Sequence, residues 1–134
     1  MKKLRCIMLI DDNPNDNFFH EREIKKTNLE AMVIAKNTAM EALEYLQAKN
    51  DLSNIQPDLI FLDIHMPEMD GWEFLQAYNQ IDKEFQNPVI IMMLTSSDNA
   101  EDVARAKVWT SVSGFITKPL TKENMNEINS RYFN

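Results

Sequence analysis

Short apolar runs alternate along the chain with longer stretches in which apolar residues recur at helical spacing. The apolar runs predict five strands, at residues 4–10, 31–35, 58–62, 88–94 and 114–117. Residues 59–62 and 89–94 are apolar at every position, as a strand requires when helices cover both faces of its sheet. Strands that alternate with helices in this way predict an α/β domain with a parallel sheet.

The stretches between these strands carry signals for the ends of helices. Asn13 followed by Pro14 predicts a capped helix over 14–26. Thr38 and Glu41 have the spacing of a capping box. The remaining helices are predicted from about residue 38 to 46, from 70 to 81 behind Asp70 and Glu73, from about 98 to 109, and from about 121 to 132.

Composition limits the function classes. A chain of 134 residues suits one domain, residues 1–134, and a net charge of −7 argues against general binding to DNA. No window reaches the roughly 20 apolar residues that span a bilayer, and nothing resembles a signal peptide, so we expect no membrane insertion and a cytoplasmic location. The single cysteine, Cys6, lies in an apolar run and is expected to be a buried thiol.

Polar side chains follow four of the predicted strands, at the point where each strand ends. These residues are Asp11 and Asp12, then Asp63, then Thr95 with Ser96 and Ser97, and finally Lys118. The carboxyl ends of parallel strands meet at one edge of the sheet, where sites in such folds form. Taken alone, the acidic pair could equally end a strand and cap a helix, but together these residues predict one acidic pocket.

The chemistry of such a pocket favours a divalent cation and phosphoryl transfer. Crowded carboxylates raise one another's pKa or recruit a cation, and their oxygens suit Mg²⁺. A carboxylate such as Asp63 that attacks phosphorus gives an acyl phosphate. The cation and Lys118 would stabilise the charge during the transfer.

The motifs at these strand ends resemble those of a known family. They are Ile10-Asp11-Asp12-Asn13, Leu62-Asp63-Ile64-His65-Met66-Pro67-Glu68-Met69-Asp70-Gly71, Leu94-Thr95-Ser96-Ser97 and Phe115-Ile116-Thr117-Lys118-Pro119. Over essentially its whole length the chain resembles a receiver domain of the two-component response regulator family, of the stand-alone type. The resemblance implies a flavodoxin-like fold, with strand order 2-1-3-4-5 and five helices on both faces.

The resemblance also implies a role for each residue of the pocket. Asp63 would be the phosphoacceptor. Asp12 would bind Mg²⁺ directly and Asp11 largely through water, and the backbone carbonyl of His65 would be a further ligand.

Further roles concern the phosphoryl oxygens and the switch. Thr95 and Lys118 would each contact a phosphoryl oxygen, with a cis Lys118–Pro119 bond aiming the lysine. Phe115 would be the switch aromatic, although an aromatic at this position is in general more often a core residue.

Partners follow from the same resemblance. The phosphodonor would be a histidine kinase or a phosphotransfer protein, and the chain would catalyse only its own phosphorylation and dephosphorylation. Because the sequence ends at Asn134, soon after the last predicted helix, we expect output through another protein or onward transfer. The face formed by the fourth helix, fifth strand and fifth helix would bind that partner or a second copy in a homodimer.

Three alternative functions fit the sequence less well. Haloacid-dehalogenase-type phosphatases need a second aspartate where this chain has His65, and an FMN carrier needs a phosphate loop where Asp11 and Asp12 would repel phosphate. A degenerate receiver that only binds partners would not need this full set of polar residues.

The two histidines are interpreted separately. The His65 side chain is expected to be exposed. The alternative, functional hypothesis is that His65 and Ser97 together control access of water to the acyl phosphate. His20 is predicted to lie on the surface.

Overall fold

The computed structural model describes residues 2–48, 55–81, 89–95 and 100–133. Ser96, Ser97 and the start of the predicted fourth helix lie outside these ranges. The elements are, in chain order, β1 Cys6–Ile10, α1 Pro14–Lys25, β2 Met32–Lys36, α2 Ala39–Gln47, β3 Leu59–Asp63, α3 Gly71–Tyr78, β4 Ile90–Thr95, α4 Ala100–Val108, β5 Gly114–Thr117 and α5 Lys122–Tyr132. None of the helices within the described ranges has the length and apolar character that crossing a membrane requires.

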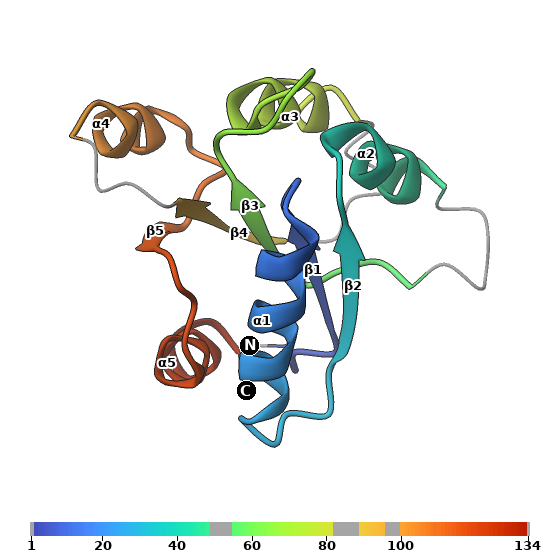
Figure 1. Ribbon diagram of the computed structural model, residues 1–134, viewed down its shortest axis with the longest axis vertical. Coiled ribbons are helices and arrows are strands. Elements are labelled where there is room, and N and C mark those ends of the chain that lie inside the picture. The colour runs from blue at the N-terminus through green and yellow to red at the C-terminus, as the bar shows by residue number, and fades with distance from the viewer. Residues whose placement is uncertain (1, 49–54, 82–88, 96–99, 134) are drawn as a thin grey trace.

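The strands form one parallel sheet in the order β2-β1-β3-β4-β5 (Figure 1). Helices α1 and α5 cover one face, and α2, α3 and α4 cover the other. Along β1 and β3 successive residues alternate between the two cores: Met8 and Ile60 pack toward α2 and α3, whereas Ile7 and Phe61 pack toward α1 and α5. The predicted fold class and strand order are therefore confirmed.

Local sequence signals fix the ends of several helices. The Asn13 side chain accepts a hydrogen bond from the backbone of Asn15 at 2.9 Å, which caps α1. Thr38 caps α2 through the backbone N–H of Glu41. Asp70 and Glu73 form a reciprocal capping box at α3. These caps satisfy backbone donors that a helix start leaves unpaired, and each starts its helix within one residue of the predicted position.

Asp58, which the apolar pattern placed inside the third strand, has a different role. Its carboxylate accepts hydrogen bonds from the backbone of Arg5 at 2.8 Å and of Cys6 at 3.1 Å, and pairs with Lys2 at 2.9 Å. It therefore joins the amino ends of β1 and β3, at the edge of the sheet opposite the acidic residues. Cys6 is buried as expected, and burial followed by the charge of Asp58 raises the pKa of its thiol to about 11.

Candidate functional site

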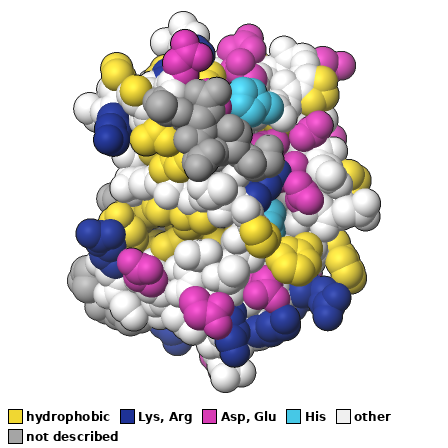
Figure 2. Space-filling view, turned by 60° about the vertical axis from the view of Figure 1, so that its left-hand side comes forward, with side chains coloured by type: hydrophobic (Ala, Val, Ile, Leu, Met, Phe, Trp, Pro, Cys, Tyr) yellow, Lys and Arg dark blue, Asp and Glu magenta, His cyan; other side chains and the backbone are white. Residues whose placement is uncertain are grey.

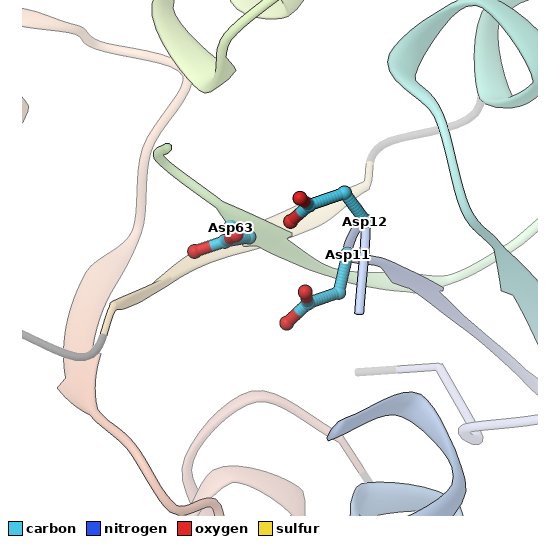
Figure 3. Close-up of side chains that lie close together, drawn as sticks. All are labelled: Asp11, Asp12 and Asp63. Carbon is cyan, nitrogen blue, oxygen red and sulfur yellow. The ribbon is translucent and has the colours of Figure 1, made fainter. Parts of the chain in front are cut away.

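Three carboxylates meet at the tips of β1 and β3 (Figure 3). Asp11 and Asp12 follow β1, and Asp63 is the last residue of β3. One carboxylate oxygen from each lies within 4.8 Å of the others. Asp11 and Asp63 are buried, whereas Asp12 is exposed at the mouth of the cluster. The structure thus brings together the three acidic residues that the sequence placed in one pocket.

The surroundings of Asp63 disfavour the ionised form of its carboxyl group. Burial, and then the negative charge of Asp11, raise the pKa of Asp63 from 3.8 to about 6, while the nearby Lys118 partly opposes the rise. A positive ion beside Asp63 would relieve this repulsion. Three hard oxygen donors, one of them open to solvent, fit a divalent cation such as Mg²⁺, which keeps several water ligands.

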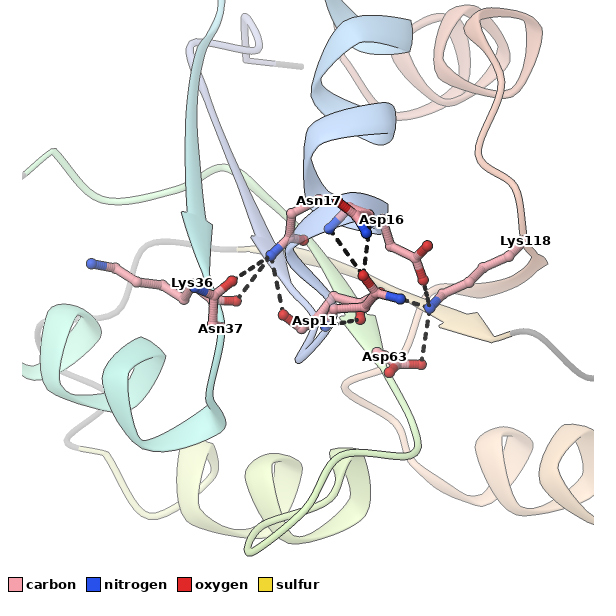
Figure 4. A network of polar contacts seen from close by, with 9 residues as sticks. Asp11, Asp16, Asn17, Lys36, Asn37, Asp63 and Lys118 are labelled. Atoms are coloured by element: carbon pink, nitrogen blue, oxygen red, sulfur yellow. Dashed lines mark hydrogen bonds and ion pairs between the residues drawn. The ribbon is translucent and has the colours of Figure 1, made fainter.

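Lys118 reaches into the same pocket from the end of β5 (Figure 4). Its Nζ lies 2.6 Å from Oδ2 of Asp11, 2.9 Å from Oδ2 of Asp16 and 3.6 Å from Oδ1 of Asp63. Burial disfavours the ammonium, but the hydrogen bonds to Asp11 and Asp16 outweigh it, so the pKa of Lys118 is raised. The ammonium is therefore charged and already placed beside the proposed acceptor. The Lys118–Pro119 bond is cis, as the resemblance implied.

Asp16 is a pocket residue that the sequence interpretation missed. It lies in the first turn of α1 and its carboxylate bonds to Lys118. An acidic residue in a first turn is commonly explained by the helix dipole alone, so no pattern in the sequence distinguishes Asp16 as a pocket residue.

Asn17 fixes the turn between β1 and α1. Its buried side-chain amide donates to the backbone carbonyl of Asp11 at 3.1 Å, to that of Lys36 at 3.4 Å and to Oδ1 of Asn37 at 3.2 Å (Figure 4). The backbone N–H of Asn13 in turn donates to the Asp11 carboxylate at 3.0 Å. These bonds hold Asp11 in place against Lys118.

His20 contradicts the sequence prediction, because it is 2% exposed rather than on the surface. Burial and the positive charge of Lys118 lower the pKa of its imidazole. The error arises because α1 reverses the usual pattern: Asn17 and His20 face inward, while Phe18 and Phe19 are 67% and 44% exposed.

Thr95 and Phe115, the predicted switch pair, lie on the neighbouring strands β4 and β5. Thr95 ends β4 and is fully buried, and its backbone carbonyl accepts a 2.6 Å hydrogen bond from the backbone N–H of Lys118. Phe115 lies on the neighbouring strand β5 and is half-buried against the core beneath α4.

Gly71 allows α3 to begin directly against the end of β3. Its backbone N–H donates to the carbonyl of Ile64 at 2.8 Å. A Cβ at this position would lie 2.7 Å from the backbone oxygen of Asp63, closer than real contacts allow, and a tight 3.0 Å from Cα of Ile64. The absence of a side chain at Gly71 therefore lets the loop after Asp63 close tightly.

The His65 side chain is exposed, as predicted, and points toward α4. Its Nε2 lies 3.1 Å from Oδ2 of Asp102, in the first turn of α4. Sequence reasoning did not connect these two residues. The proposed partnership of His65 with Ser97 falls outside the described residues.

Comparisons with protein families, with individual proteins and with solved structures all identify relatives of the same kind. Residues 7–129 match the family described as Response regulator receiver domain. The chain is 29% identical over 115 residues to Response regulator Rcp1 of Synechocystis sp., covering 85% of this chain and 76% of that protein. It is 28% identical over 119 residues to Protein PilG of Pseudomonas aeruginosa, covering 89% and 80%. A two-component response regulator from Cytophaga hutchinsonii has a TM-score of 0.86 at 27% identity, covering 97% of each chain.

Proposed function

We infer the function from the family, because the chain belongs to the response regulator receiver domains and is thus a phosphoacceptor switch of a two-component system. We propose that Asp63 is its phosphoacceptor. The observation that carries this proposal is the buried Asp63 carboxylate between two other carboxylates and the ammonium of Lys118. The family match favours this function over the phosphatase and FMN-carrier alternatives.

The transfer can be written for a phosphohistidine donor. An oxygen of the Asp63 carboxylate attacks phosphorus, so that a P–O bond forms while the P–N bond breaks. The electron pair of the broken bond stays on the histidine nitrogen, which then takes up a proton. Asp63 attacks as the anion, and its pKa of about 6 leaves it mostly ionised at neutral pH.

Receiver domains bind Mg²⁺ at an acidic pocket, and we propose that Asp11, Asp12 and Asp63 hold it here, with the carbonyl of His65 as a further ligand. The ion would neutralise charge on the phosphoryl oxygens. In this chain the exposed carboxylate of Asp12 is the most open to such an ion, whereas Asp11 is engaged by Lys118.

Lys118 is proposed to exchange partners on phosphorylation. In the structure its ammonium bonds to Asp11 and Asp16 and lies 3.6 Å from Asp63. A phosphoryl group on Asp63 brings further negative oxygens to this ammonium. We propose that the hydroxyl of Thr95 binds another phosphoryl oxygen, and that Phe115 follows its movement.

Receiver domains are phosphorylated by histidine kinases or phosphotransfer proteins, and we propose that α1 contributes to docking the donor. Phe18 and Phe19 form an exposed aromatic pair on the helix that also carries Asp16. A donor must bring its phosphohistidine to Asp63, so its surface must approach the mouth of the pocket, close to the start of α1. Apolar contact with this pair would orient it.

For output we propose the face formed by α4, β5 and α5, as a site for a downstream protein or a second copy. Hydrophobic side chains lie in a hollow band on the side of the molecule shown in Figure 2. A groove of about 220 Å³ runs between α4 and β5, and another of about 270 Å³ between β5 and α5. Phe115 lines both, so a movement of this ring would reshape the face.

The test is phosphorylation by acetyl phosphate in the presence of Mg²⁺, followed by intact-mass analysis and peptide mapping. The wild type is expected to gain one phosphoryl group on Asp63, and Asp63→Asn is expected to gain none. The matched control is Asp70→Asn, which removes a nearby carboxylate but keeps a good helix cap. Labelling of the wild type at another residue would refute Asp63 as the acceptor.

A further inference from the structure

Helix α4 is tied to the acceptor loop and to α3 by two polar contacts. Oδ2 of Asp102 lies 3.1 Å from Nε2 of His65, two residues after Asp63. The guanidinium of Arg105 lies 4.8 Å from the ring centroid of Trp72, near the start of α3. Asp102 and Arg105 are three residues apart and therefore lie on one face of α4. A segment of chain joins Asp63 to α3. One contact connects α4 to the beginning of this segment, at His65, and the other connects α4 to its end, at Trp72.

The contact between His65 and Asp102 does not require a charged imidazole. A neutral ring that carries its proton on Nε2 donates a hydrogen bond to the carboxylate, and an ionised acceptor strengthens that bond. The Asp102 side chain is 15% exposed and that of His65 is 65% exposed, so the interaction is of moderate strength. It joins a loop to a helix 37 residues away, and so breaking it loosens the packing between elements.

A phosphoryl group on Asp63 would oppose this contact. It adds about −1.5 to −2 of charge and three acceptor oxygens near the loop that carries His65. These oxygens would compete with Asp102 for the imidazole N–H. Their charge would also add to that of the neighbouring carboxylates of Asp11 and Asp12.

We propose that Asp102 is a positioning residue that holds the His65 side chain toward α4 until Asp63 is phosphorylated, linking the state of the pocket to the position of α4. The inference rests on the proposed function, in which Asp63 accepts the phosphoryl group. This link is separate from Thr95 and Phe115, because it runs directly from the acceptor loop to the helix. Coupling between two sites is reciprocal, so weakening the His65–Asp102 contact should favour phosphoryl binding.

The test is a double-mutant cycle with Asp102→Ala and His65→Asn. All four proteins carry Trp109→Phe, so that Trp72, beneath Arg105, is the remaining tryptophan. Each is titrated with beryllium fluoride in Mg²⁺, a stable mimic of the phosphoryl group, and followed by tryptophan fluorescence. Hydrogen exchange of α4 amides gives a second measurement that does not depend on fluorescence.

With His65 present, Asp102→Ala is expected to lower the half-saturating concentration of beryllium fluoride by about two- to fivefold. In the His65→Asn background the same substitution should have no effect. In Mg²⁺ alone, Asp102→Ala should also speed α4 exchange toward the rate that the wild type shows with beryllium fluoride. A merely structural role for Asp102 predicts weaker binding instead.

Besides such weaker binding, two outcomes would overturn the inference alone. One is an equal shift in both backgrounds, which would reflect the charge of Asp102 at the start of α4. The other is no shift in either background together with unchanged exchange of α4. A wild type that binds no beryllium fluoride and gains no phosphoryl group from acetyl phosphate would instead refute the proposed function, and the inference with it.

Discussion

Replacing Asp63 with asparagine is expected to stabilise the protein in the absence of metal at neutral pH. Asp63 is 5% exposed and lies beside Asp11 and Asp12, and its ionised form is disfavoured by burial and by their charges. Asparagine has nearly the same shape and no charge, and thus resembles the protonated acid. The substitution removes the proposed acceptor and, with it, the repulsion that the pocket maintains.

The magnitude follows from the pKa of Asp63, which rises from 3.8 to about 6 on folding. Each pKa unit corresponds to about 1.4 kcal/mol, so ionised Asp63 lowers the free energy of unfolding by about 3 kcal/mol. Because Lys118 already contributes to this pKa, its attraction for Asp63 is included. We therefore expect Asp63→Asn to raise the free energy of unfolding by about 2–3 kcal/mol above pH 7.

The sign of the pH dependence is fixed by the same shift. Between roughly pH 4 and 6 the folded wild type binds more protons than the unfolded chain, so its stability falls as pH rises through this window. The asparagine variant lacks this term. The difference in stability between the two proteins should be small below about pH 4 and should reach its full value above about pH 7.

The assay is urea denaturation in EDTA across this pH range, repeated with Mg²⁺ at neutral pH. An ion that binds the folded wild type should stabilise it more than the variant, and should therefore reduce the difference. A variant less stable than the wild type at pH 7.5 in EDTA would refute the reasoning. So would a difference that does not change with pH.

Three further substitutions test the framework of the pocket. Lys118→Met should lower stability by about 3 kcal/mol, because it leaves buried carboxylates without their cation, and should slow labelling by acetyl phosphate more than tenfold. Asn17→Ala should lower the free energy of unfolding, measured by urea denaturation, by about 2 kcal/mol because its hydrogen bonds are lost. The control, Asn15→Ala on the exposed side of α1, should change it by less than about 0.5 kcal/mol. Gly71→Ala should reduce both thermal stability and labelling, because its Cβ would strike the backbone of Asp63. Gly114→Ala should lower the melting temperature less, since its Cβ would meet the flexible end of Met92.

The sheet and most of the pocket could be predicted because they depend on local patterns. Uninterrupted apolar runs define the central strands, and polar residues at their carboxyl ends must meet at one edge. This reasoning predicts that Asp63, Thr95 and Lys118 meet, and the structure brings the side chains of Asp63 and Lys118 together with Asp11 and Asp12. Thr95 contacts Lys118 through the backbone.

The remaining features depend on packing between elements. Helix α1 exposes two phenylalanines and buries two polar residues, contrary to the assumption that apolar residues face inward. For this reason the sequence does not identify Asp16, Asn17 and His20 as residues that pack at the pocket. The contact between His65 and Asp102 depends on how α4 lies over the sheet, and no local pattern encodes that placement.

If the donor docks on α1 as proposed, the residues of this helix that bind the donor differ from those that pack in the core. Its inward contacts are made by Asn17, His20 and Ile24, whereas Phe18 and Phe19 contribute little to either core. Substitutions at the two phenylalanines can therefore alter the outer surface while leaving the scaffold intact. A gene duplicate of this chain could acquire a new phosphodonor through such changes, and the residues of its pocket would stay the same.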